Sequence, residues 1–392
     1  MKKALVVGGG NGIGLAISLK LLENGYEHIY IVGKDIAEIN DIPENKKEEF
    51  KSKTSFAKIN LTQGDYRVFD GIKDIDTLVI TAGFGRVAPF EELADWEIDN
   101  LIKCNELAVI QIIKKYYEKI KSHKKFYCAV MGSIAGYICS PLFSVYSAAK
   151  SGVCRFIENI NAELSHDAYQ NRILNVSPGS LKGTKFNGGS NSLEVLDDIV
   201  AEIISRMFNG DVLFIPQYEE VYKDVIDRSQ KNPIEFGRES YEYKLASGRL
   251  SYKRQGVVGY LSGTFDLFHI GHLNLLRRAK EQCDYLIVGV HKSGAWKGKE
   301  TYISFEERKE IVGNIKYVDQ VVESYPEDSL AYDNLKFDRL FVGSDYKGTE
   351  RFLRYEEYFK DKGVEIVYFP YTNSTSSTQL RAAISKNIDK DA

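Results

Sequence analysis

Three glycines near the start of the chain have the spacing of a turn that could hold a dinucleotide. Gly8, Gly12 and Gly14 stand in the run GGGNGIG, directly after the apolar run ALVV, which we expect to be the first strand. Glycine there allows the backbone to turn tightly and to approach a pyrophosphate at the N-terminus of the following helix. Alone, such a turn is weak evidence, because glycine also serves close packing.

Further motifs follow downstream in order: Thr81-Ala82-Gly83, Asn105, Gly132-Ser133, Tyr146 with Lys150 four residues later, and Pro178-Gly179. Together with the glycine turn they resemble the short-chain dehydrogenase/reductase family over roughly residues 1–230. The resemblance implies that one catalytic constellation comprises Ser133, Tyr146, Lys150 and Asn105. It also implies that the cofactor contacts Gly8, Gly12, Ile13, Gly14, Gly33, Lys34, Asn60, Ala82, Gly83, Lys150, Pro178 and Gly179.

The chemistry of these residue types suits proton donation by the tyrosine to a substrate. A free phenol has a pKa near 10, and an ammonium beside it favours the phenolate, so we expect Lys150 to lower the pKa of Tyr146. Tyr146 would then protonate a substrate oxygen as hydride arrives. The resemblance implies that Ser133 holds that oxygen, that Lys150 also holds the nicotinamide ribose, and that Asn105 supports a proton-relay water. The alternative is that Tyr146 is merely one of 25 tyrosines and Lys150 a solvated helix charge.

The end of the second expected strand bears on the choice of cofactor. An NAD-dependent protein of this fold usually places a carboxylate there to bind the ribose hydroxyls. Here Gly33 stands in that place and Lys34 follows it, and a cation suits a ribose phosphate. The sequence therefore predicts NADPH. Asp35 follows immediately, and Asn11 stands where many NADP-dependent relatives carry a basic residue, so NADH stays the alternative.

A second set of reactive residues lies in the decapeptide from Gly263 to His272, which holds two of the six histidines. His269 and His272 share one helix face, because residues three apart are neighbours on a helix. Gly271 between them leaves room for a bulky anion at the helix start. A zinc pair is the competing interpretation, but no third ligand of the right type accompanies the two histidines.

The decapeptide and the following LNLLRRAK resemble the cytidylyltransferase family, most closely its glycerol-3-phosphate cytidylyltransferases, from about Val257 to the C-terminus. Further matches follow in order: Lys297 and Lys299 before Tyr302, Glu307-Arg308-Lys309, the run from Val342 to Gly348, and the Ser/Thr cluster from Ser374 to Thr378. The resemblance implies that a substrate phosphate attacks the α-phosphate of CTP in line, with Mg²⁺ bridging the phosphates and no protein metal ligand.

The same resemblance implies roles for individual residues. His269 and His272 would stabilise charge on the triphosphate, and Lys297 and Lys299 would bind acceptor and nucleotide phosphates. The predicted CTP contacts are Gly263, Thr264, Phe265, His269, His272, Lys299, Arg308, Asp345, Ser376, Ser377 and Thr378. An ordinary capped helix is the alternative for the Ser/Thr run.

The chain departs from the cytidylyltransferase pattern just before the Ser/Thr run. Tyr371 and Asn373 stand where relatives carry an arginine and a glutamate. The departure removes a phosphate-binding cation, so affinity, nucleotide orientation or choice of acceptor can differ.

The alternation of expected strands and helices along the chain predicts an α/β fold with two Rossmann-like, doubly wound parallel-sheet domains in tandem. Short β-branched runs alternate with amphipathic segments of helical period, as in a parallel sheet with crossover helices. We expect a reductase domain over 1–230, a linker over 231–254 and a nucleotidyltransferase domain over 255–392. The uncharged stretch 126–149 contains Gly, Pro and four serines, which favours a strand, a loop and a helix start over a membrane span.

Composition narrows the classes of partner. A net charge of −3 argues against nucleic acid and anionic membrane surfaces as partners. Five cysteines without CxxC spacing favour a reducing compartment, so we expect a cytoplasmic protein. Small-molecule substrates and a homo-oligomer, either dimer or tetramer, complete the expectation.

Two such domains in one chain suggest consecutive steps. A keto-sugar phosphate would be reduced to a polyol phosphate, which would receive CMP to give a CDP-alditol for a capsule or a teichoic-acid-like polymer. The substrate phosphate needs a cation near Tyr146, and the candidates are Arg86, Lys182 and Lys185. One alternative keeps both activities with glycerol, another polyol or an amino-alcohol phosphate as acceptor. The other has one domain silent, serving as a nucleotide-binding or dimerising scaffold.

Overall fold

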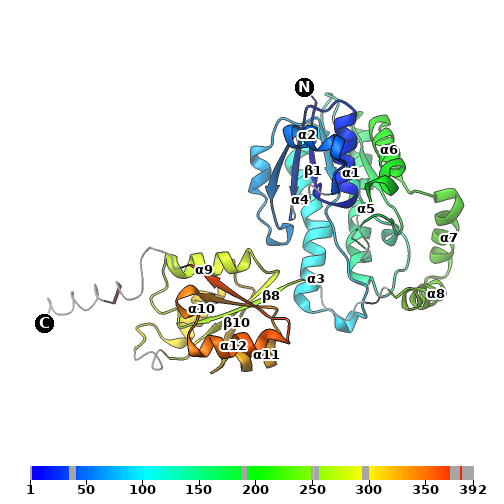
Figure 1. Cartoon of the computed structure of the whole chain (residues 1–392). Coiled ribbons are helices and arrows are strands. Elements are labelled where there is room, and N and C mark those ends of the chain that lie inside the picture. The colour runs from blue at the N-terminus through cyan, green and yellow to red at the C-terminus, as the bar shows by residue number, and fades with distance from the viewer. Residues whose placement is uncertain are drawn as a thin grey trace. The chain divides into compact units, whose positions relative to one another are not determined.

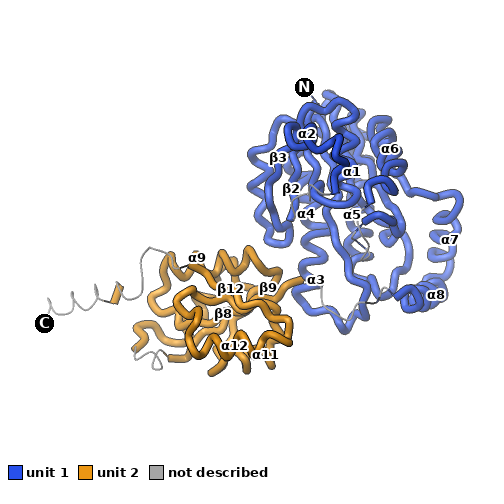
Figure 2. The backbone as a smooth tube through the Cα atoms, in the orientation of Figure 1, with its two compact units in different colours: residues 1–254 blue, residues 255–392 orange. Residues whose placement is uncertain are grey.

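The computed structural model describes residues 2–34, 41–184, 186, 192–248, 250, 256–293, 300–370 and 380–381. The chain divides into two compact units, Met1–Arg254 and Gln255–Ala392 (Figure 2). Each unit holds one parallel sheet with helices packed against it (Figure 1), which confirms the predicted α/β class. None of the helices that the structure describes is long and apolar enough to cross a membrane.

Unit 1 is built on a seven-stranded parallel sheet in the order β3-β2-β1-β4-β5-β6-β7. Its strands are β1 (Lys3–Val7), β2 (His28–Gly33), β3 (Thr54–Lys58), β4 (Thr77–Ile80), β5 (Tyr127–Met131), β6 (Ile173–Val176) and β7 (Leu213–Phe214). The chain moves outward in one direction from β1 and in the other from β4. The loops that leave β1 and β4 therefore diverge, and the crevice between them is the ordinary ligand position of such sheets.

Helices cover both faces of this sheet because alternate residues of each strand point to opposite sides. Ala4 and Val6 pack into a core with α1 and α6, whereas Leu5 and Val7 pack into a second core with α4 and α5. The helices of unit 1 are α1 (Gly12–Glu23), α2 (Glu44–Lys53), α3 (Asp95–Ile102), α4 (Ala108–Ile120), α5 (Ser144–His166), α6 (Leu193–Asn209), α7 (Lys223–Lys231) and α8 (Pro233–Ala246).

The segment 231–254, expected as a linker, contains α8 and belongs to unit 1. Lys244 near the end of α8 donates hydrogen bonds to the Ser140 hydroxyl at 2.8 Å and to the Pro141 carbonyl at 2.7 Å. These contacts join α8 to the loop that precedes α5. The uncharged stretch 126–149 contains β5, a short turn at Ile134–Gly136 and the start of α5, as predicted.

Unit 2 has a five-stranded parallel sheet in the order β10-β9-β8-β11-β12. Its strands are β8 (Val258–Gly263), β9 (Tyr285–Val290), β10 (Gln320–Glu323), β11 (Arg339–Gly343) and β12 (Glu365–Phe369). The helices are α9 (Ile270–Lys280), α10 (Phe305–Gly313), α11 (Asp328–Leu335) and α12 (Glu350–Lys360). The strand order reverses between β8 and β11, so the crevice of this sheet lies beside the segment that carries the two histidines.

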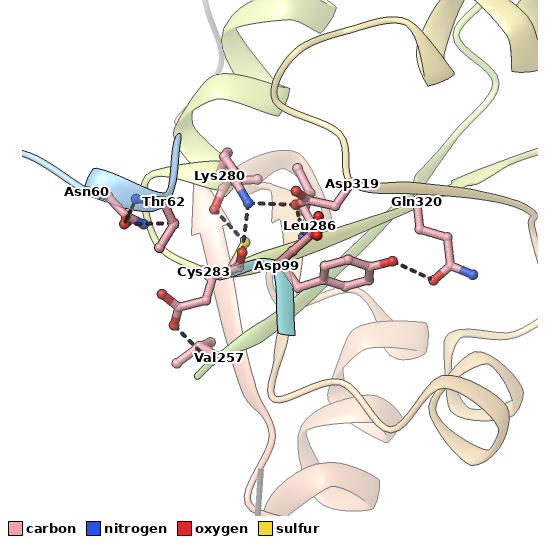
Figure 3. A network of polar contacts seen from close by, with 12 residues as sticks. Asn60, Thr62, Asp99, Val257, Lys280, Cys283, Leu286, Asp319 and Gln320 are labelled. Atoms are coloured by element: carbon pink, nitrogen blue, oxygen red, sulfur yellow. Dashed lines mark hydrogen bonds and ion pairs between the residues drawn. The ribbon is translucent and has the colours of Figure 1, made fainter. Parts of the chain in front are cut away.

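A nearly buried cation joins α9 to β9 and β10 in unit 2 (Figure 3). The Lys280 ammonium donates to Asp319 at 2.6 Å and to the Asp284 carbonyl at 2.8 Å, and its side chain is 8% exposed. Asp319 also accepts the main-chain N–H of Leu286 at 2.7 Å. Asp319 thus compensates a charge that the helix buries.

We expect Asp319→Ala to lower the free energy of unfolding of unit 2 by about 1.5–3 kcal/mol, because it leaves the Lys280 charge without its carboxylate. Thermal unfolding, with the transition of unit 2 identified by hydrogen exchange of the β8 and β9 amides, measures the change. Glu323→Ala is the matched control, because it removes an exposed pair with Lys292 whose contribution is about 0.5 kcal/mol or less. Equal effects of the two variants would contradict this account.

Candidate active sites

At their first residues, before they diverge, the loops that leave β1 and β4 lie too close together for a side chain to fit between them. Gly8 has a φ of +87°, and a Cβ there would lie 2.6 Å from the main-chain nitrogen of Ala82. A Cβ at Gly14 would lie 2.3 Å from the carbonyl oxygen of Gly8. Positions 8 and 14 therefore admit no side chain, and main-chain N–H groups at the start of a helix suit a pyrophosphate.

Asn105 is fully buried behind the loop after β4. Its amide donates to the carbonyls of Phe84 at 2.8 Å and Leu101 at 3.0 Å, and its oxygen accepts the Phe84 N–H at 3.3 Å. A Cβ at Gly83 would lie 2.7 Å from that oxygen. Asn105 lies in a π-helical turn, Lys103–Leu107, that joins α3 to α4, and such turns occur frequently at functional sites.

The structure brings Ser133, Tyr146 and Lys150 together at the carboxyl end of β5. Tyr146 and Lys150 lie one turn apart on α5, 6% and 2% exposed. The Lys150 ammonium lies 5.7 Å from the centre of the Tyr146 ring and donates to the Met131 carbonyl at 2.8 Å. The Ser133 hydroxyl interacts with the Tyr146 phenol and accepts the N–H of Ala135 at 3.2 Å.

Burial changes the acid–base behaviour that the sequence suggested. We expected Lys150 to lower the pKa of Tyr146, but burial raises the pKa of Tyr146 to about 12, against a smaller lowering by the Ser133 hydrogen bond. Burial also lowers the pKa of Lys150 to about 8. Desolvation disfavours the charged form of each group, and it is the largest cause of both shifts. At neutral pH, Tyr146 is therefore a phenol and Lys150 is mostly an ammonium.

The remaining predicted cofactor contacts lie in the first turn of α1 and at or just beyond the carboxyl ends of β2 and β3. Gly33 is buried at the end of β2 and accepts the N–H of Ile59 at 2.8 Å, whereas Lys34 is exposed. Ile13 packs partly against the core near α1. Asn60 is half-buried and accepts from both the N–H and the hydroxyl of Thr62, at 3.1 and 2.8 Å. The cofactor roles of these residues stay predictions.

Pro178 and Gly179 follow β6 and complete the floor beside Ser133. The Pro178 carbonyl accepts the N–H of Ile134 at 3.0 Å. The hydroxyl of Tyr222 occupies the space beside Gly179, since a Cβ there would lie 1.6 Å from it. A side chain at position 179 would have to displace the Tyr222 ring, and Tyr222 is a neighbour of the site that the sequence motifs did not indicate.

The three candidate cations for a substrate phosphate lie in different surroundings or outside the described residues. Arg86 is 4% exposed, and one nitrogen of its guanidinium donates to both carboxylate oxygens of Glu97, at 2.9 and 2.8 Å. It is therefore committed to a buried ion pair, and its expected role is unsupported. Lys182 is exposed, while Lys185 lies outside the described residues.

Two aromatic rings lie beside the Tyr146 ring. The ring centre of Phe143 lies 4.4 Å from that of Tyr146, and the Phe186 ring centre lies 5.5 Å away. A Cβ at Gly85 would lie 2.7 Å from Phe143, so the loop after β4 also closes on these rings. No motif in the sequence singles out these two phenylalanines.

In unit 2, the two predicted histidines form the start of α9. The N–H of Gly271 donates to Nδ1 of His269 at 3.0 Å, and the N–H of His269 donates to Nδ1 of His272 at 3.3 Å. The two ring centres lie 4.1 Å apart. Because each Nδ1 accepts a hydrogen bond, the neutral imidazoles carry their proton on Nε2 and can donate from it.

Burial lowers the pKa of both rings. The pKa of His272 falls to about 4, chiefly through burial and then through the neighbouring His269. The pKa of His269 is also lowered by burial. At neutral pH, both side chains are therefore neutral hydrogen-bond donors, and they would stabilise phosphate charge through Nε2–H groups.

Two buried charges organise the loop between β8 and α9. Asp266, 3% exposed, accepts the N–H groups of Tyr302 and Ile303 at about 3 Å and pairs with Arg381. Arg308, fully buried on α10, donates to four main-chain carbonyls, those of Thr264, His291, Lys292 and Ile303. Arg308, predicted to contact CTP, thus shapes the loop with its guanidinium. Asp266 lies in the decapeptide, so the sequence shows a carboxylate there, but it does not show which groups that carboxylate binds.

The other predicted CTP contacts fall into two groups. Gly263 ends β8, and Thr264 and buried Phe265 follow it into the loop, while Asp345 is exposed after β11. Lys297, Lys299, Ser376, Ser377 and Thr378 lie outside the described residues, as do Tyr371 and Asn373. Among the residues that are described, no group of three or more His, Cys, Asp or Glu could hold a metal ion.

Comparison with known proteins gives a family for each unit. A model of the short chain dehydrogenase family matches residues 2–194, and a model of the cytidylyltransferase-like family matches residues 260–383. The chain joins a short chain dehydrogenase domain to a cytidylyltransferase-like domain. Both resemblances expected from the motifs are thereby confirmed, and both are families of enzymes.

Individual relatives cover one domain each. Glycerol-3-phosphate cytidylyltransferase of Bacillus spizizenii is 39% identical over 129 residues, which are 32% of this chain and 93% of the relative. The 3-oxoacyl-[acyl-carrier-protein] reductase FabG of Staphylococcus epidermidis is 29% identical over 54% of this chain and 86% of its own. A short-chain dehydrogenase from Sphingobium yanoikuyae in complex with NADPH shares the fold of the dehydrogenase domain, with a TM-score of 0.50, 18% identity, and coverage of 60% of this chain and 95% of its own.

We expect the imidazole of His272 to remain neutral until the pH falls to about 4. Burial disfavours the imidazolium, so the ring gains its proton well below the pKa of a free histidine. Two-dimensional NMR of the imidazole carbons against pH measures this, with the signal assigned by its absence in His272→Gln. Titration of that signal at pH 6.5 or above would show that the ring is not buried as described.

Proposed function

We propose that the chain is a bifunctional enzyme that makes a CDP-alditol. The dehydrogenase domain would reduce a keto-sugar phosphate with NADPH to a polyol phosphate. The cytidylyltransferase-like domain would transfer CMP from CTP to that phosphate and release pyrophosphate, for surface-polysaccharide synthesis. The observation that carries the proposal is the presence in one chain of the assembled Ser133, Tyr146 and Lys150 site and of the His269 and His272 pair.

The reductase step follows from the protonation states of the buried pair. Tyr146 holds its proton at neutral pH and can give it to the carbonyl oxygen of the substrate, while the Ser133 hydroxyl holds that oxygen. Lys150 is charged below about pH 8 and stabilises the phenolate that results. NADPH supplies the hydride when bound, and the bare turn at Gly8 and Gly14 fits its pyrophosphate.

The transferase step needs positioning and charge stabilisation. An oxygen of the acceptor phosphate would form a bond to the α-phosphorus of CTP, and the bond from that phosphorus to the bridging oxygen would break. Pyrophosphate would leave with the electron pair. The Nε2–H groups of His269 and His272 would stabilise the charge that develops on phosphate oxygens, with Mg²⁺ held chiefly by the phosphates. Contacts from Lys297, Lys299, Ser376, Ser377 and Thr378 stay part of the proposal.

A specific observation favours glycerol phosphate as one acceptor. The relative that is 39% identical over almost all of its length is a glycerol-3-phosphate cytidylyltransferase. Glycerol phosphate is the smallest polyol phosphate, and reduction of a three-carbon ketose phosphate yields it. Both candidates therefore belong to one reaction sequence, in which ketone reduction supplies the acceptor. A cytoplasmic location and a homo-oligomer also stay predictions.

If the two active sites are independent, a substitution in one site should abolish only the reaction of that site. Tyr146→Phe should lower the rate of NADPH-dependent ketose phosphate reduction by about a hundredfold or more, the range for a lost general acid, and leave CMP transfer unchanged. His272→Ala should lower CMP transfer by about a hundredfold and leave reduction unchanged. Absorbance of NADPH and release of pyrophosphate measure the two rates. Tyr243→Phe and His166→Ala, both at exposed positions, are the controls. Loss of both activities in one folded variant would contradict two independent sites.

The exposed Lys34 predicts the preference for NADPH. Lys34→Ala should raise the KM for NADPH roughly tenfold or more, because a charge-assisted contact with the ribose phosphate is lost, and should change the KM for NADH less than about twofold. Steady-state kinetics with both cofactors measure the difference. Lys73→Ala, another exposed lysine, is the control. A similar rise for both cofactors would remove Lys34 from the phosphate site.

A further inference from the structure

Two helices at the end of unit 1 lie beyond the helices that cover its sheet (Figure 1). A π-helical turn, Tyr218–Tyr222, leads into α7 and α8, and we call residues 218–246 the helical pair. Asn232 separates the two helices and caps α8 with its side-chain oxygen. Arg228 on α7 forms an ion pair with Glu239 on α8. The two helices are thus held to each other by contacts of their own.

The helical pair binds three consecutive residues of the loop that follows β5. The buried Ser229 hydroxyl on α7 accepts the N–H of Cys139 at 2.8 Å. The Lys244 ammonium on α8 donates to the Ser140 hydroxyl at 2.8 Å and to the Pro141 carbonyl at 2.7 Å. Both helices therefore fix the main chain of this loop from its outer side.

A glycine lets α8 lie close to the same loop. Gly237 is buried within α8, and a Cβ there would lie 3.0 Å from Sγ of Cys139. Glycine within a helix is less favourable than alanine, because its backbone loses more conformational freedom on folding. The helix carries this cost at the point where it contacts the loop.

The loop held by the helical pair contains a residue with a strained backbone. Leu142 is buried and has a φ of +62°, in the left-handed region that residues with a side chain rarely adopt. Such a conformation persists only where the surrounding contacts hold it. From the other side, the Leu142 carbonyl accepts the N–H of Ala88, in the loop after β4, at 2.8 Å. Residues 139–143 are therefore held between the loop after β4 and the helical pair.

The helical pair contacts two loops that lie beside the reductase site. Phe143 comes directly after the strained residue, and its ring centre lies 4.4 Å from that of Tyr146. A displacement of residues 139–141 would therefore reach the ring beside the Tyr146 phenol. In the loop after β6, the Tyr222 hydroxyl occupies the space beside Gly179. The helical pair thus holds chain segments from both β5 and β6.

We propose that Ser229 and Lys244 are positioning residues for the reductase reaction. By holding the loop after β5, they keep Phe143 against Tyr146 and the phenol in the place where it meets the substrate carbonyl. Positioning of this kind matters, because a displacement of about 1 Å in an active site can lower a rate about a hundredfold. These roles hold for any ketone that the dehydrogenase domain reduces, so they do not depend on the proposed keto-sugar phosphate.

Lys244→Met tests these roles, because it keeps a long side chain and removes both hydrogen bonds to the loop. The substrates for the full chain with NADPH are dihydroxyacetone phosphate, a five-carbon ketose phosphate and cyclohexanone. The kcat for reduction should fall roughly tenfold, while the Kd for NADPH changes less than about twofold. Ser229→Ala, which removes the acceptor of the Cys139 N–H, should have the same effect. Lys223→Met removes an exposed pair with Glu219 in the same helical pair, and as the matched control it should change neither value.

Hydrogen exchange of the NADPH-bound full chain measures the loop without turnover. The main-chain amides of residues 139–147 should exchange roughly tenfold faster in Lys244→Met and Ser229→Ala than in the parent, while those of β5 stay unchanged.

The outcomes separate the positioning roles from the proposed function. A lower melting temperature with unchanged kcat and unchanged exchange would show that the contacts only stabilise the fold, and would overturn the positioning roles. Equal losses in NADPH binding and in kcat would overturn them as well. If the parent reduces cyclohexanone but neither ketose phosphate, only the proposed substrate fails, and cyclohexanone still tests the two residues. If it reduces none of the three, faster exchange at 139–147 supports the roles and unchanged exchange overturns them.

Discussion

Both sites depend on places at the carboxyl ends of strands where backbone or ring atoms leave no room for a side chain. Gly8 lies so close to Ala82, and Gly14 so close to the Gly8 carbonyl, that a Cβ at either glycine would clash. In unit 2, Gly263 at the end of β8 leaves the Phe265 ring its place in the same way, because a Cβ there would lie 2.9 Å from a ring carbon. The strand order reverses beside β1 and beside β8. The loops diverge at these two points and leave a crevice, and the close contacts lie beside it.

Burial at these strand ends then decides the chemistry of the side chains. Desolvation keeps Tyr146 as a phenol, brings the pKa of Lys150 down to about 8 and keeps His272 neutral. In the reductase site this arrangement suits proton donation, since the acid is protonated and its neighbour is charged near neutral pH. In the transferase site it makes the histidines hydrogen-bond donors through Nε2, without adding positive charge. Burial thus sets the protonation states of these side chains in both domains.

Much of the fold was predictable from the sequence, because parallel sheets alternate buried strands with amphipathic helices in an order that the chain displays. The grouping of Ser133, Tyr146 and Lys150 was also predictable, since the resemblance to short-chain dehydrogenases implies that they form one constellation. Interactions between residues that no motif links could not be predicted from the sequence. The Arg86 and Glu97 pair, the four carbonyl contacts of Arg308 and the docking of α8 through Lys244 each depend on tertiary packing. The direction of the Tyr146 pKa shift was wrong for the same reason, because sequence shows the neighbouring charge but not the depth of burial.

The central claim is that the product of the first domain is the acceptor of the second. NADPH that carries deuterium at its transferable position tests it, when the full chain is supplied with a keto-sugar phosphate, CTP and Mg²⁺ and the products are analysed by mass spectrometry. The account predicts a CDP-linked alditol that is one mass unit heavier than the product made with ordinary NADPH, with the label on the carbon that was the ketone. A labelled alcohol that never acquires CMP, or a CDP-linked product without deuterium, would contradict it.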